Sequence, residues 1–399
     1  MVNVAILGFG TVGSGVAEVI HKNNSHIARK VADQIHVKYI LDIRDFPDSI
    51  FADRIVHDFS IIENDPEVNV VVETIGGATI ALDYTRRALQ AGKNVVTSNK
   101  ELVACHGYQL LQIAKEKGVS YLFEASVGGG IPIIRPITQC LAANELLEIA
   151  GILNGTTNYI LTRMIRAGMP FEIALKEAQE MGYAERDPSA DIEGHDACRK
   201  ICILSALAFG RHVYPHQVPT EGITGITLSD VEYARSGGMK IKLLGRAIRR
   251  DDDKICAFVA PHLVPETAPL ASVEDVFNGI SLKGDAIGEV MFYGPGAGKL
   301  PTASAVVADV MDAAKHLKAR KYIDWDDGGE EAVYPVSEVN SRWYVRACHT
   351  VSVPEDVTIL TNDGEADTVA FITNGTFSEG QLLAMLPEGS VLAHYRVLA

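Results

Sequence analysis

Residues 182–209 combine carboxylates with one lysine in a pattern that suits acid–base chemistry. The segment reads GYAERDPSADIEGHDACRKICILSALAF, and an apolar helical stretch opens near Gly194. Asp196 and Lys200 are four residues apart and therefore share a helix face. Because the helix continues as Ile201–Leu204, we expect Lys200 to be buried, to need a partner and to have a lowered pKa, although a solvated ion pair is the alternative. The acidic residues, counting one just before the segment, are Glu180, Glu185, Asp187, Asp191, Glu193 and Asp196.

The same helix carries His195, Cys198 and Cys202 at i, i+3 and i+7. This spacing raises the question of a metal site, but no second group of ligands with zinc-type spacing stands elsewhere in the sequence. Small cysteines on an apolar helix usually pack in a core. We expect these three residues to bind no metal.

The amino-terminal residues have the order of a dinucleotide-binding turn. The apolar run Val4–Leu7 is followed by GFGTVG and then by the helical stretch Ser14–Ile20. In such a turn Gly8 permits the tight bend, Gly10 lets the backbone approach a pyrophosphate, and Gly13 lets the helix pack on the strand. The context favours dinucleotide binding over a plain glycine turn.

A second predicted strand, Val37–Leu41, ends at Asp42, and Arg44 follows two residues later. An acid at this place binds the adenosine ribose of NAD, whereas an arginine faces the 2′-phosphate of NADP. The pair leaves the choice between NAD and NADP open.

Strands and helices alternate through the rest of this region, which predicts a parallel sheet covered on both faces. The loops Thr74–Gly77 and Ser98–Lys100 follow strand ends and should line the cofactor crevice. There Lys100 could bind a phosphate, a substrate carboxylate or a hydroxyl; an ordinary surface lysine is the alternative. The further predicted strands are Val68–Glu73, Asn94–Thr97 and Ser120–Glu124, and the predicted helices are Ala81–Ala91 and Tyr108–Lys117.

Two polar or glycine-rich loops follow. Gly128–Gly130 leaves backbone carbonyls free to coordinate an ion or to meet another domain, although a hinge is the commoner use of such a turn. Asn154–Asn158 lies between two apolar runs, and its amides and hydroxyls suit a carboxylate, with a turn or a helix cap as the alternative.

Composition excludes several classes of protein. The chain has 399 residues, a formal charge of −15 and 47% hydrophobic residues, which argues against a disordered tail and a nucleic-acid binder. The length allows two or three domains. No apolar run suits a membrane span, and the first residues enter a strand, so we expect neither an anchor nor a leader. Six scattered cysteines suit reduced thiols in a cytoplasm.

Several ordered motifs together resemble homoserine dehydrogenase, the enzyme family that interconverts L-homoserine and L-aspartate 4-semialdehyde with NAD or NADP. The resemblance covers roughly residues 2–325. Its motifs are GFGTVG, TSNKELVA from 97, EASVGGGIP from 124, LNGTTNYIL from 153, GYAERDPSADIEGHDACRK from 182 and GPGAGKLPTASAVVAD from 294.

The resemblance assigns roles by position. It implies that Lys200 is the proton donor, with Lys100 as a second active-site lysine and Asp196 orienting the amine. It also implies substrate contacts from Glu185, Asp191, Gly155 and Thr156, cofactor contacts from Thr11, Val12 and Gly298, and a sodium ion held mainly through backbone oxygens of Glu124, Val127, Gly129 and Ile131. With the residues singled out from the sequence pattern, the expected cofactor-binding set is Gly8, Gly10, Thr11, Val12, Gly13, Asp42, Arg44, Thr74, Gly76, Ser98, Lys100 and Gly298, and Tyr183 joins the expected substrate-binding set.

Two positions depart from the family pattern. Lys299 follows PGAG where a small or neutral residue is usual, close to the expected cofactor, and Arg186 stands beside Glu185. We expect activity to survive, with an effect on cofactor preference. One alternative is another oxidoreductase of this fold. If that were an acylating semialdehyde dehydrogenase, Cys105 would be the candidate nucleophile, but the sequence shows no clear base for it. A non-catalytic nucleotide sensor is the other alternative.

The expected architecture is α/β. It has a Rossmann-like domain over 1–131, rejoined by a helix near 302–318, and an inserted α/β substrate and dimerisation domain over 132–301. Its sheet would include Ile241–Ala247, Ile255–Val259 and Glu289–Tyr293. A linker over 319–339 precedes residues 340–399, which resemble a small α+β ACT regulatory module without its first helix, so amino-acid feedback is not expected. The family implies a homodimer or homotetramer.

Overall fold

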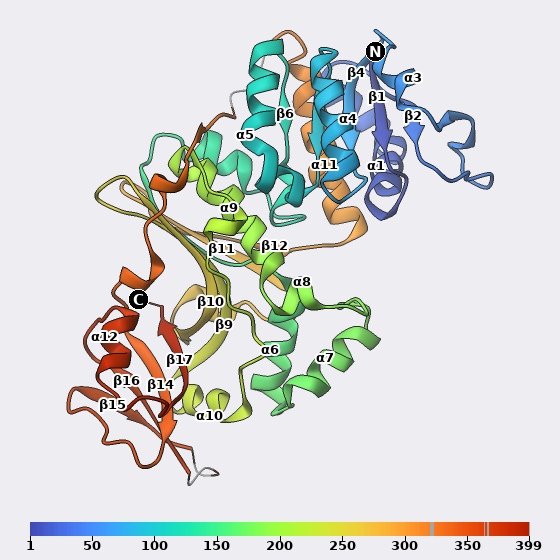
Figure 1. The fold of residues 1–399 in the computed structure, drawn as a ribbon. Coiled ribbons are helices and arrows are strands. Elements are labelled where there is room, and N and C mark those ends of the chain that lie inside the picture. The colour runs from blue at the N-terminus through green and yellow to red at the C-terminus, as the bar shows by residue number, and fades with distance from the viewer. Residues whose placement is uncertain (320–322, 363, 365–366, 399) are drawn as a thin grey trace. The chain divides into compact units, whose positions relative to one another are not determined.

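The computed structural model describes residues 1–319, 323–362, 364 and 367–398 (Figure 1). The chain forms two compact units. Unit 1 comprises 1–143, 206–214 and 295–327, and unit 2 comprises 144–205, 215–294 and 328–399. Parts of the predicted linker (320–322) and of the predicted carboxyl-terminal module (363, 365, 366 and 399) lie outside the described residues.

Unit 1 is built on a six-stranded parallel sheet with the order β3-β2-β1-β4-β5-β6. This order is that of the Rossmann fold. The order in which successive strands are added reverses between β1 and β4, and dinucleotides bind at that switch point. The strands are β1 (Val2–Leu7), β2 (Ile35–Leu41), β3 (Ile55–Val56), β4 (Val68–Glu73), β5 (Asn94–Thr97) and β6 (Tyr121–Leu122).

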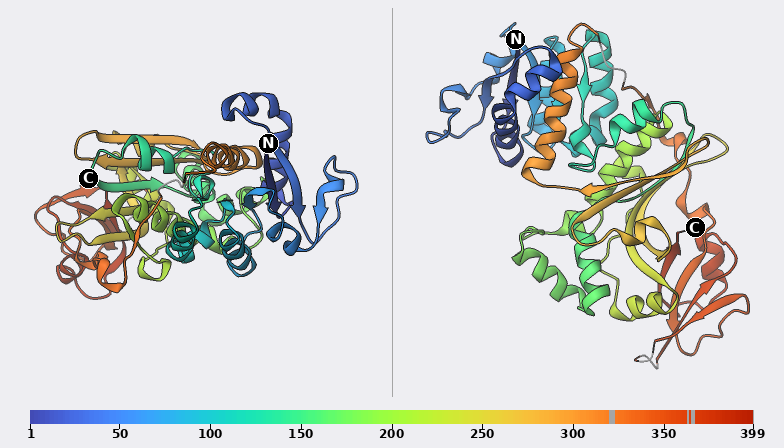
Figure 2. Two further views of the ribbon diagram at one scale, coloured as in Figure 1. Left: turned by 90° about the horizontal axis from the view of Figure 1, so that it is seen from above. Right: turned by 180° about the vertical axis from the view of Figure 1, so that it is seen from behind.

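The helices of unit 1 cover this sheet, and the late helix α11 is one of them. Helix α11 lies beside α1 (Figure 2), and a Cβ on Gly15 would come within 3.1 Å of the Ala303 side chain. Val16 of α1 and Val306 of α11 join the strands in one buried cluster. The helices are α1 (Thr11–Lys22), α2 (Asn24–Val31), α3 (Phe59–Glu63), α4 (Thr79–Gln90), α5 (Lys100–Lys117) and α11 (Lys299–Lys315), and a short pair, β8 (Arg211–His212) and β13 (Asp326–Asp327), completes the unit.

Two predicted boundaries in unit 1 were wrong. Helix α5 begins at Lys100 rather than Tyr108, because the Asn99 side chain accepts a hydrogen bond from the Leu102 amide and caps the helix there. Strand β6 ends at Leu122 rather than Glu124, because residues Glu124–Ser126 turn into a 3-10 helix.

Unit 2 is built on a nine-stranded mixed sheet with the order β12-β11-β7-β9-β10-β17-β14-β16-β15. The predicted strands near 241, 255 and 289 are confirmed, while β7, β11 and β15 had not been predicted as strands. The bounds are β7 (Leu146–Ile152), β9 (Met239–Arg249), β10 (Ile255–Pro265), β11 (Phe277–Gly284), β12 (Gly288–Pro295), β14 (Trp343–Cys348), β15 (Val357–Leu360), β16 (Thr368–Thr373) and β17 (Val391–Val397).

Helices pack on this sheet closely where glycine allows it. A Cβ on Gly245 of β9 would lie 2.8 Å from the Leu153 side chain and 3.2 Å from Ile201, so only glycine lets α9 approach the strand. The helices are α6 (Gly155–Ala167), α7 (Phe171–Glu180), α8 (Ser189–Ile192), α9 (His195–Phe209), α10 (Leu228–Ser236) and α12 (Glu379–Ala384). Among the described residues, no helix is long and apolar enough to cross a membrane.

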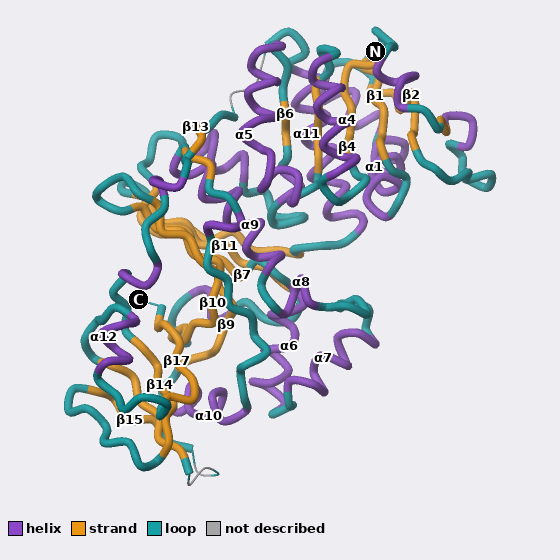
Figure 3. The backbone as a smooth tube through the Cα atoms, viewed as in Figure 1, coloured by secondary structure: helices purple, strands orange, loops and turns teal. Residues whose placement is uncertain are grey.

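The carboxyl-terminal strands continue the same sheet. Strand β17 pairs with β10 in parallel, and β17, β14, β16 and β15 then follow in antiparallel order. Figure 3 shows β17, β14 and β15 in orange at the carboxyl-terminal end of the chain. Residues 350–355 form loops and bends between β14 and β15. The buried carboxylate of Asp230 in α10 accepts hydrogen bonds from Tyr344 (2.9 Å) and Arg346 (2.8 Å), which fastens these strands to the rest of unit 2.

Candidate active site

The glycine loop of unit 1 has the backbone that its sequence predicted. Gly8 has a φ of +88°, and a Cβ at Gly13 would lie 1.9 Å from the Gly8 carbonyl oxygen, so neither position accepts a side chain. Around Gly10, by contrast, a Cβ would meet nothing within 4 Å. Gly10 immediately precedes Thr11 and Val12 at the amino end of α1. Backbone amides at a helix start with open space before them suit a pyrophosphate.

Asp42 and Arg44 form an ion pair beside this loop. The Asp42 carboxylate accepts hydrogen bonds from the Phe9 amide (2.7 Å) and from Arg44 Nε (3.0 Å). The Arg44 hydrogen bond is the main reason why the pKa of Asp42 falls to about 2, so the carboxylate stays charged. Its oxygens are thus occupied, while the Arg44 side chain remains 60% exposed.

A buried acid that the sequence reading did not single out organises the next two strand ends. Glu73 ends β4 and accepts hydrogen bonds from Thr97 Oγ1 (2.6 Å) and from the Ile75 amide (2.7 Å). Burial raises the pKa of Glu73, and these hydrogen bonds oppose that rise. The Gly76 amide, whose residue has a φ of +86°, also donates to the Glu73 carboxylate, at 3.4 Å. Glu73 thus links the predicted loop 74–77 to Thr97, which directly precedes the predicted loop 98–100.

The remaining residues predicted at this crevice take up defined places. Thr74 donates its hydroxyl to the Leu7 carbonyl (2.9 Å) and so ties its loop to the glycine loop. Ser98 is half-buried after β5, and Lys100 is the half-buried first residue of α5.

At the start of α11, Gly298 has a φ of +126°, and Lys299 forms an ion pair with Glu18 of α1 (2.8 Å). The lysine that departs from the family pattern therefore has a carboxylate partner on the neighbouring helix. Arg186, the other departure, is exposed.

The predicted cation segment is shaped by the Glu124 side chain. The buried carboxylate accepts hydrogen bonds from the amides of Ile133 (2.7 Å), Ile134 (2.8 Å) and Arg135 (3.0 Å). Gly129 packs so closely on Gly296 that a Cβ would lie 2.3 Å from its carbonyl oxygen. Val127 and Ile131 are buried in the same turn. Because the carboxylate is committed to three amides, the carbonyl oxygens of this turn are the groups that fit a cation.

In unit 2 the Lys200 amine is buried and paired, as the sequence predicted. The residue is 8% exposed, and its Nζ donates to Asp196 Oδ2 at 2.7 Å and to the Leu153 carbonyl at 2.6 Å. Asp196 is 4% exposed and lies one turn earlier on α9. A buried ammonium needs such a carboxylate, because desolvation otherwise disfavours its charge.

Asn154 links this pair to a second acid, a connection that the sequence reading did not foresee. Its side-chain oxygen caps α6 by accepting from the Thr157 amide (2.8 Å), while its Nδ2 donates to Asp191 (2.7 Å) and to Asp196 (2.9 Å). Burial raises the pKa of Asp191, which the hydrogen bond from Asn154 opposes. The helix cap that the sequence allowed as an alternative is thus real, and it also orients two carboxylates.

The other predicted substrate residues lie around this start of α6. Thr156 donates its hydroxyl to the Tyr183 carbonyl (2.7 Å), which holds the segment of Tyr183 and Glu185 beside the helix. Both of these side chains are exposed. Gly155 has no room for a side chain, because a Cβ would lie 2.7 Å from the Val276 carbonyl oxygen. The start of α6 therefore carries both the Asn154 contact to the acid that holds Lys200 and the Thr156 contact to the exposed Tyr183 segment.

His195 differs from Cys198 and Cys202 in its exposure to solvent. His195 is exposed and its ring contacts Glu193 (3.2 Å), whereas the two cysteines are buried. The Cys198 thiol faces the Pro215 carbonyl (3.6 Å), and a hydrogen bond with Cys202 lowers its pKa to about 7.

Comparison with known proteins agrees with the fold and the motifs. A family model for homoserine dehydrogenase matches residues 132–311, and one for its NAD-binding domain matches residues 8–124. The homoserine dehydrogenase of Bacillus subtilis is 42% identical over 324 residues, which is 79% of this chain and 74% of that protein.

Solved structures give the same answer. A homoserine dehydrogenase from Thiobacillus denitrificans superposes with a TM-score of 0.86 at 34% identity, covering 100% of this chain and 98% of that one. A hyperthermophilic archaeal homoserine dehydrogenase solved in complex with NADPH gives 0.66 at 28% identity, over 78% of this chain and 97% of that one.

Three features define the class of this protein as an NAD(P)-dependent oxidoreductase. They are the Rossmann-type sheet, the glycine loop at its switch point and the matched NAD-binding domain. Within that class, the chain belongs to the homoserine dehydrogenase family.

Proposed function

We propose that Lys200 is the acid–base group in the interconversion of L-homoserine and L-aspartate 4-semialdehyde by this chain. The observation that carries the proposal is the buried Lys200 amine, held by Asp196 at 2.7 Å and by the Leu153 carbonyl at 2.6 Å. When bound, the nicotinamide cofactor supplies or accepts the hydride at the terminal carbon of the substrate. In aldehyde reduction the Lys200 ammonium gives a proton to the terminal oxygen and becomes a neutral amine, and in alcohol oxidation the neutral amine takes the proton of the hydroxyl.

The surrounding residues hold the rest of the substrate. Carboxylates of Glu185 and Asp191 suit the substrate ammonium, and the amides and hydroxyl of Gly155 and Thr156 at the start of α6 suit its carboxylate, because a helix amino end favours an anion. Asp196 keeps the amine oriented and balances its charge. Lys100, at the start of α5 in unit 1, is a cation that suits the cofactor phosphate.

The experiment is homoserine oxidation, followed by cofactor absorbance, for Lys200→Met. We expect kcat to fall by about 10³-fold because methionine keeps the shape but carries no proton. Lys176→Met removes a lysine from the exposed face of α7, where its amine lies 4.0 Å from Glu180, and serves as the matched control. Wild-type kcat in folded Lys200→Met would overturn the role.

The Asp42–Arg44 pair favours NADP. The Asp42 carboxylate accepts four hydrogen bonds, one from the Phe9 amide and three from nitrogens of Arg44. The Arg44 side chain is exposed beside the glycine loop and can face a 2′-phosphate. The family relative solved with NADPH supports this choice. We expect Arg44→Ala to raise KM for NADP about tenfold and KM for NAD about twofold or less. The exposed Arg29→Ala is the control, and an unchanged KM for NADP in Arg44→Ala would contradict the proposal.

A sodium ion is proposed for the turn of Glu124, Val127, Gly129 and Ile131, held by carbonyl oxygens, which hard cations prefer. The bound ion would fix the turn that packs on Gly296. Thermal unfolding in sodium, potassium and choline chloride at one ionic strength tests this: a higher Tm in sodium supports the site, and equal Tm values contradict it.

The chain is also proposed to form a homodimer or homotetramer through the β12 end of the unit 2 sheet. Strand β12 is an edge strand, and Tyr293 on it is 53% exposed. Ile287, just before β12, is 45% exposed, and Leu147 on β7 is 38% exposed. Exposed apolar side chains on an edge strand are typical of an interface. Light scattering should give at least twice the chain mass for wild type and a smaller mass for Tyr293→Lys; a monomeric wild type would contradict the proposal.

The carboxyl-terminal strands are proposed to support packing rather than amino-acid feedback. Their antiparallel order β17-β14-β16-β15 with α12 before β17 is consistent with an ACT-like module that lacks its first helix, and they share the sheet of unit 2. Titration with L-threonine should leave the rate of homoserine oxidation unchanged, whereas strong saturable inhibition would contradict this role.

A further inference from the structure

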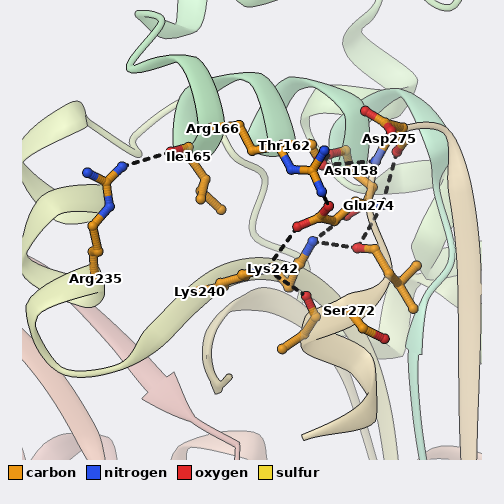
Figure 4. Close-up of polar contacts among 12 residues, drawn as sticks. Asn158, Thr162, Ile165, Arg166, Arg235, Lys240, Lys242, Ser272, Glu274 and Asp275 are labelled. Atoms are coloured by element: carbon orange, nitrogen blue, oxygen red, sulfur yellow. Dashed lines mark hydrogen bonds and ion pairs between the residues drawn. The ribbon is translucent and has the colours of Figure 1, made fainter. Parts of the chain in front are cut away.

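Lys242 is a second buried lysine in unit 2, and its surroundings differ from those of Lys200. It lies on β9 and is 1% exposed. Its Nζ donates to the Asn158 side-chain oxygen at 3.0 Å and to the Val273 carbonyl at 2.6 Å (Figure 4). Both acceptors are neutral. Burying a lysine costs free energy, so a lysine held only by neutral oxygens needs an explanation.

The carboxylate of Glu274, the residue after Val273, is engaged by other cations. Glu274 binds Lys240 (2.8 Å) and Arg166, and both of these cations also face Lys242 and disfavour its charge. Asp275 favours that charge from the same segment. Burial is the largest cause of the shift, and the pKa of Lys242 falls to about 7.

Asn158 connects this amine to the start of α6. Its side-chain nitrogen lies within hydrogen-bond distance of the carbonyls of three alternate residues in one segment, Val273 (3.3 Å), Asp275 (3.0 Å) and Phe277 (3.1 Å). Lys242 donates to the side-chain oxygen of Asn158 and to the Val273 carbonyl, so it links the same two parts of the chain. The segment 273–277 is therefore fixed to the first turn of α6.

The same segment reaches the substrate loop. The Val276 carbonyl oxygen lies 2.7 Å from where a Cβ on Gly155 would stand. The backbone N–H of Asn158 donates to the backbone carbonyl of Asn154 at 3.3 Å. Asn154 in turn donates to Asp196, the partner of Lys200. A continuous set of contacts thus runs from Lys242 through Asn158 and Asn154 to the Lys200 pair.

We propose that Lys242 is a positioning residue of the reaction: through Asn158 and the Val273 carbonyl it fixes the start of α6, and thereby the orientation of Asn154 toward Asp196 and Lys200. This inference rests on the proposed role of Lys200. The buried Lys242 amine donates two hydrogen bonds. A methionine of similar length cannot replace it, because methionine has no side-chain donor.

The test compares Lys242→Met with Lys240→Met. Lys240 lies two residues earlier on β9, and its amine contacts Glu274 and the Ala271 carbonyl but not Asn158. We expect kcat/KM for homoserine to fall about tenfold or more in Lys242→Met and about twofold or less in Lys240→Met, because loss of geometry near the reacting groups is costly.

Two further readouts separate positioning from a merely structural role. The pH profile of kcat should shift in Lys242→Met, because the Asp196–Lys200 pair is reoriented, and should not shift in Lys240→Met. In a double-mutant cycle with Asn158→Leu, the losses in kcat/KM should be less than additive, because both changes break one connection. If Lys242→Met does not fold, Lys242→Gln, which keeps a donor on a shorter side chain, takes its place.

The outcomes are distinct from those of the proposed function. A wild-type protein that does not oxidise homoserine with either cofactor contradicts the proposed function. An active wild type whose Lys242 variant matches the Lys240 variant in kcat/KM and pH profile contradicts the positioning role alone, as do additive losses with Asn158→Leu.

Discussion

Lys200 and Lys242 are both buried in unit 2, yet they are held in opposite ways. Lys200 has a carboxylate partner at 2.7 Å, whereas Lys242 donates only to neutral oxygens, with Lys240 and Arg166 nearby. A paired amine can keep its charge in a site that excludes water, and a group that moves protons needs such control. Burial alone therefore does not mark a lysine for the proposed proton transfer, because the partner of the amine decides whether it keeps its charge.

The largest effect that would sharpen this contrast comes from Asp196→Asn. The change leaves the Lys200 amine buried beside a neutral amide, which makes its surroundings similar to those of Lys242. We expect kcat for homoserine oxidation to fall by about 10²-fold or more. Circular dichroism would verify the fold, and the exposed Asp187→Asn is the matched control. A kcat close to wild type in Asp196→Asn would show that the carboxylate is not what distinguishes the two lysines.

Asn154→Ala should have the next largest effect, because it removes the contact through which Asp191 and Asp196 are oriented and also removes the cap of α6. We expect kcat/KM to fall by about tenfold and the free energy of unfolding to fall by about 1 kcal/mol, the usual worth of an N-cap. Asn154→Ser keeps a capping oxygen without the amide donor, so it should recover stability but not activity. Recovery of both would mean that only the cap matters.

Much of this site could be predicted from the sequence, but only where local spacing carries the information. The four-residue separation of Asp196 and Lys200 predicts a shared helix face, and the spacing in GFGTVG predicts the turn of Gly8 and Gly13. Both are confirmed. Glycines and i,i+4 pairs act within one element, which explains why a sequence shows them.

Asn154 and Lys242 show what the sequence could not provide. Asn154 reaches Asp191 and Asp196, which lie 37 and 42 residues away, so its second role depends on tertiary structure. Lys242 stands between Ile241 and Leu243, and alternation along a strand predicts a polar face there. Both faces of β9 are covered in the fold, so the lysine is buried instead. Glu73, at a strand end where an acid is common, gave no sign of its burial either.

The smallest expected effect is on stability, and it isolates Lys242. Its pKa is about 7 in the folded chain against an ordinary value of 10.5. Below pH 7 the amine is charged in both states and the folded state carries the cost of burial. Between pH 7 and 10.5 only the unfolded chain keeps the proton, so raising the pH through this window increases the free energy of unfolding, by on the order of 1 kcal/mol per pH unit from this group.

Urea unfolding of wild type and Lys242→Met near pH 7 and pH 9 measures this contribution. The wild type should gain more stability over this interval than the variant. Lys240→Met keeps the buried Lys242 amine but removes a cation that lowers its pKa, so it should gain less than wild type and more than Lys242→Met. Equal gains in wild type and Lys242→Met would show that Lys242 titrates normally, and the contrast between the two lysines would then rest on geometry alone.

The most direct test of the central claim is a stopped-flow measurement of aspartate 4-semialdehyde reduction in a single turnover, from low to high pH. If the Lys200 amine gives the proton, the wild-type rate falls as the pH rises and the amine loses its charge, and folded Lys200→Met is slow and loses that dependence. A Lys200→Met enzyme that reduces the aldehyde at the wild-type rate with the same pH profile would contradict the claim.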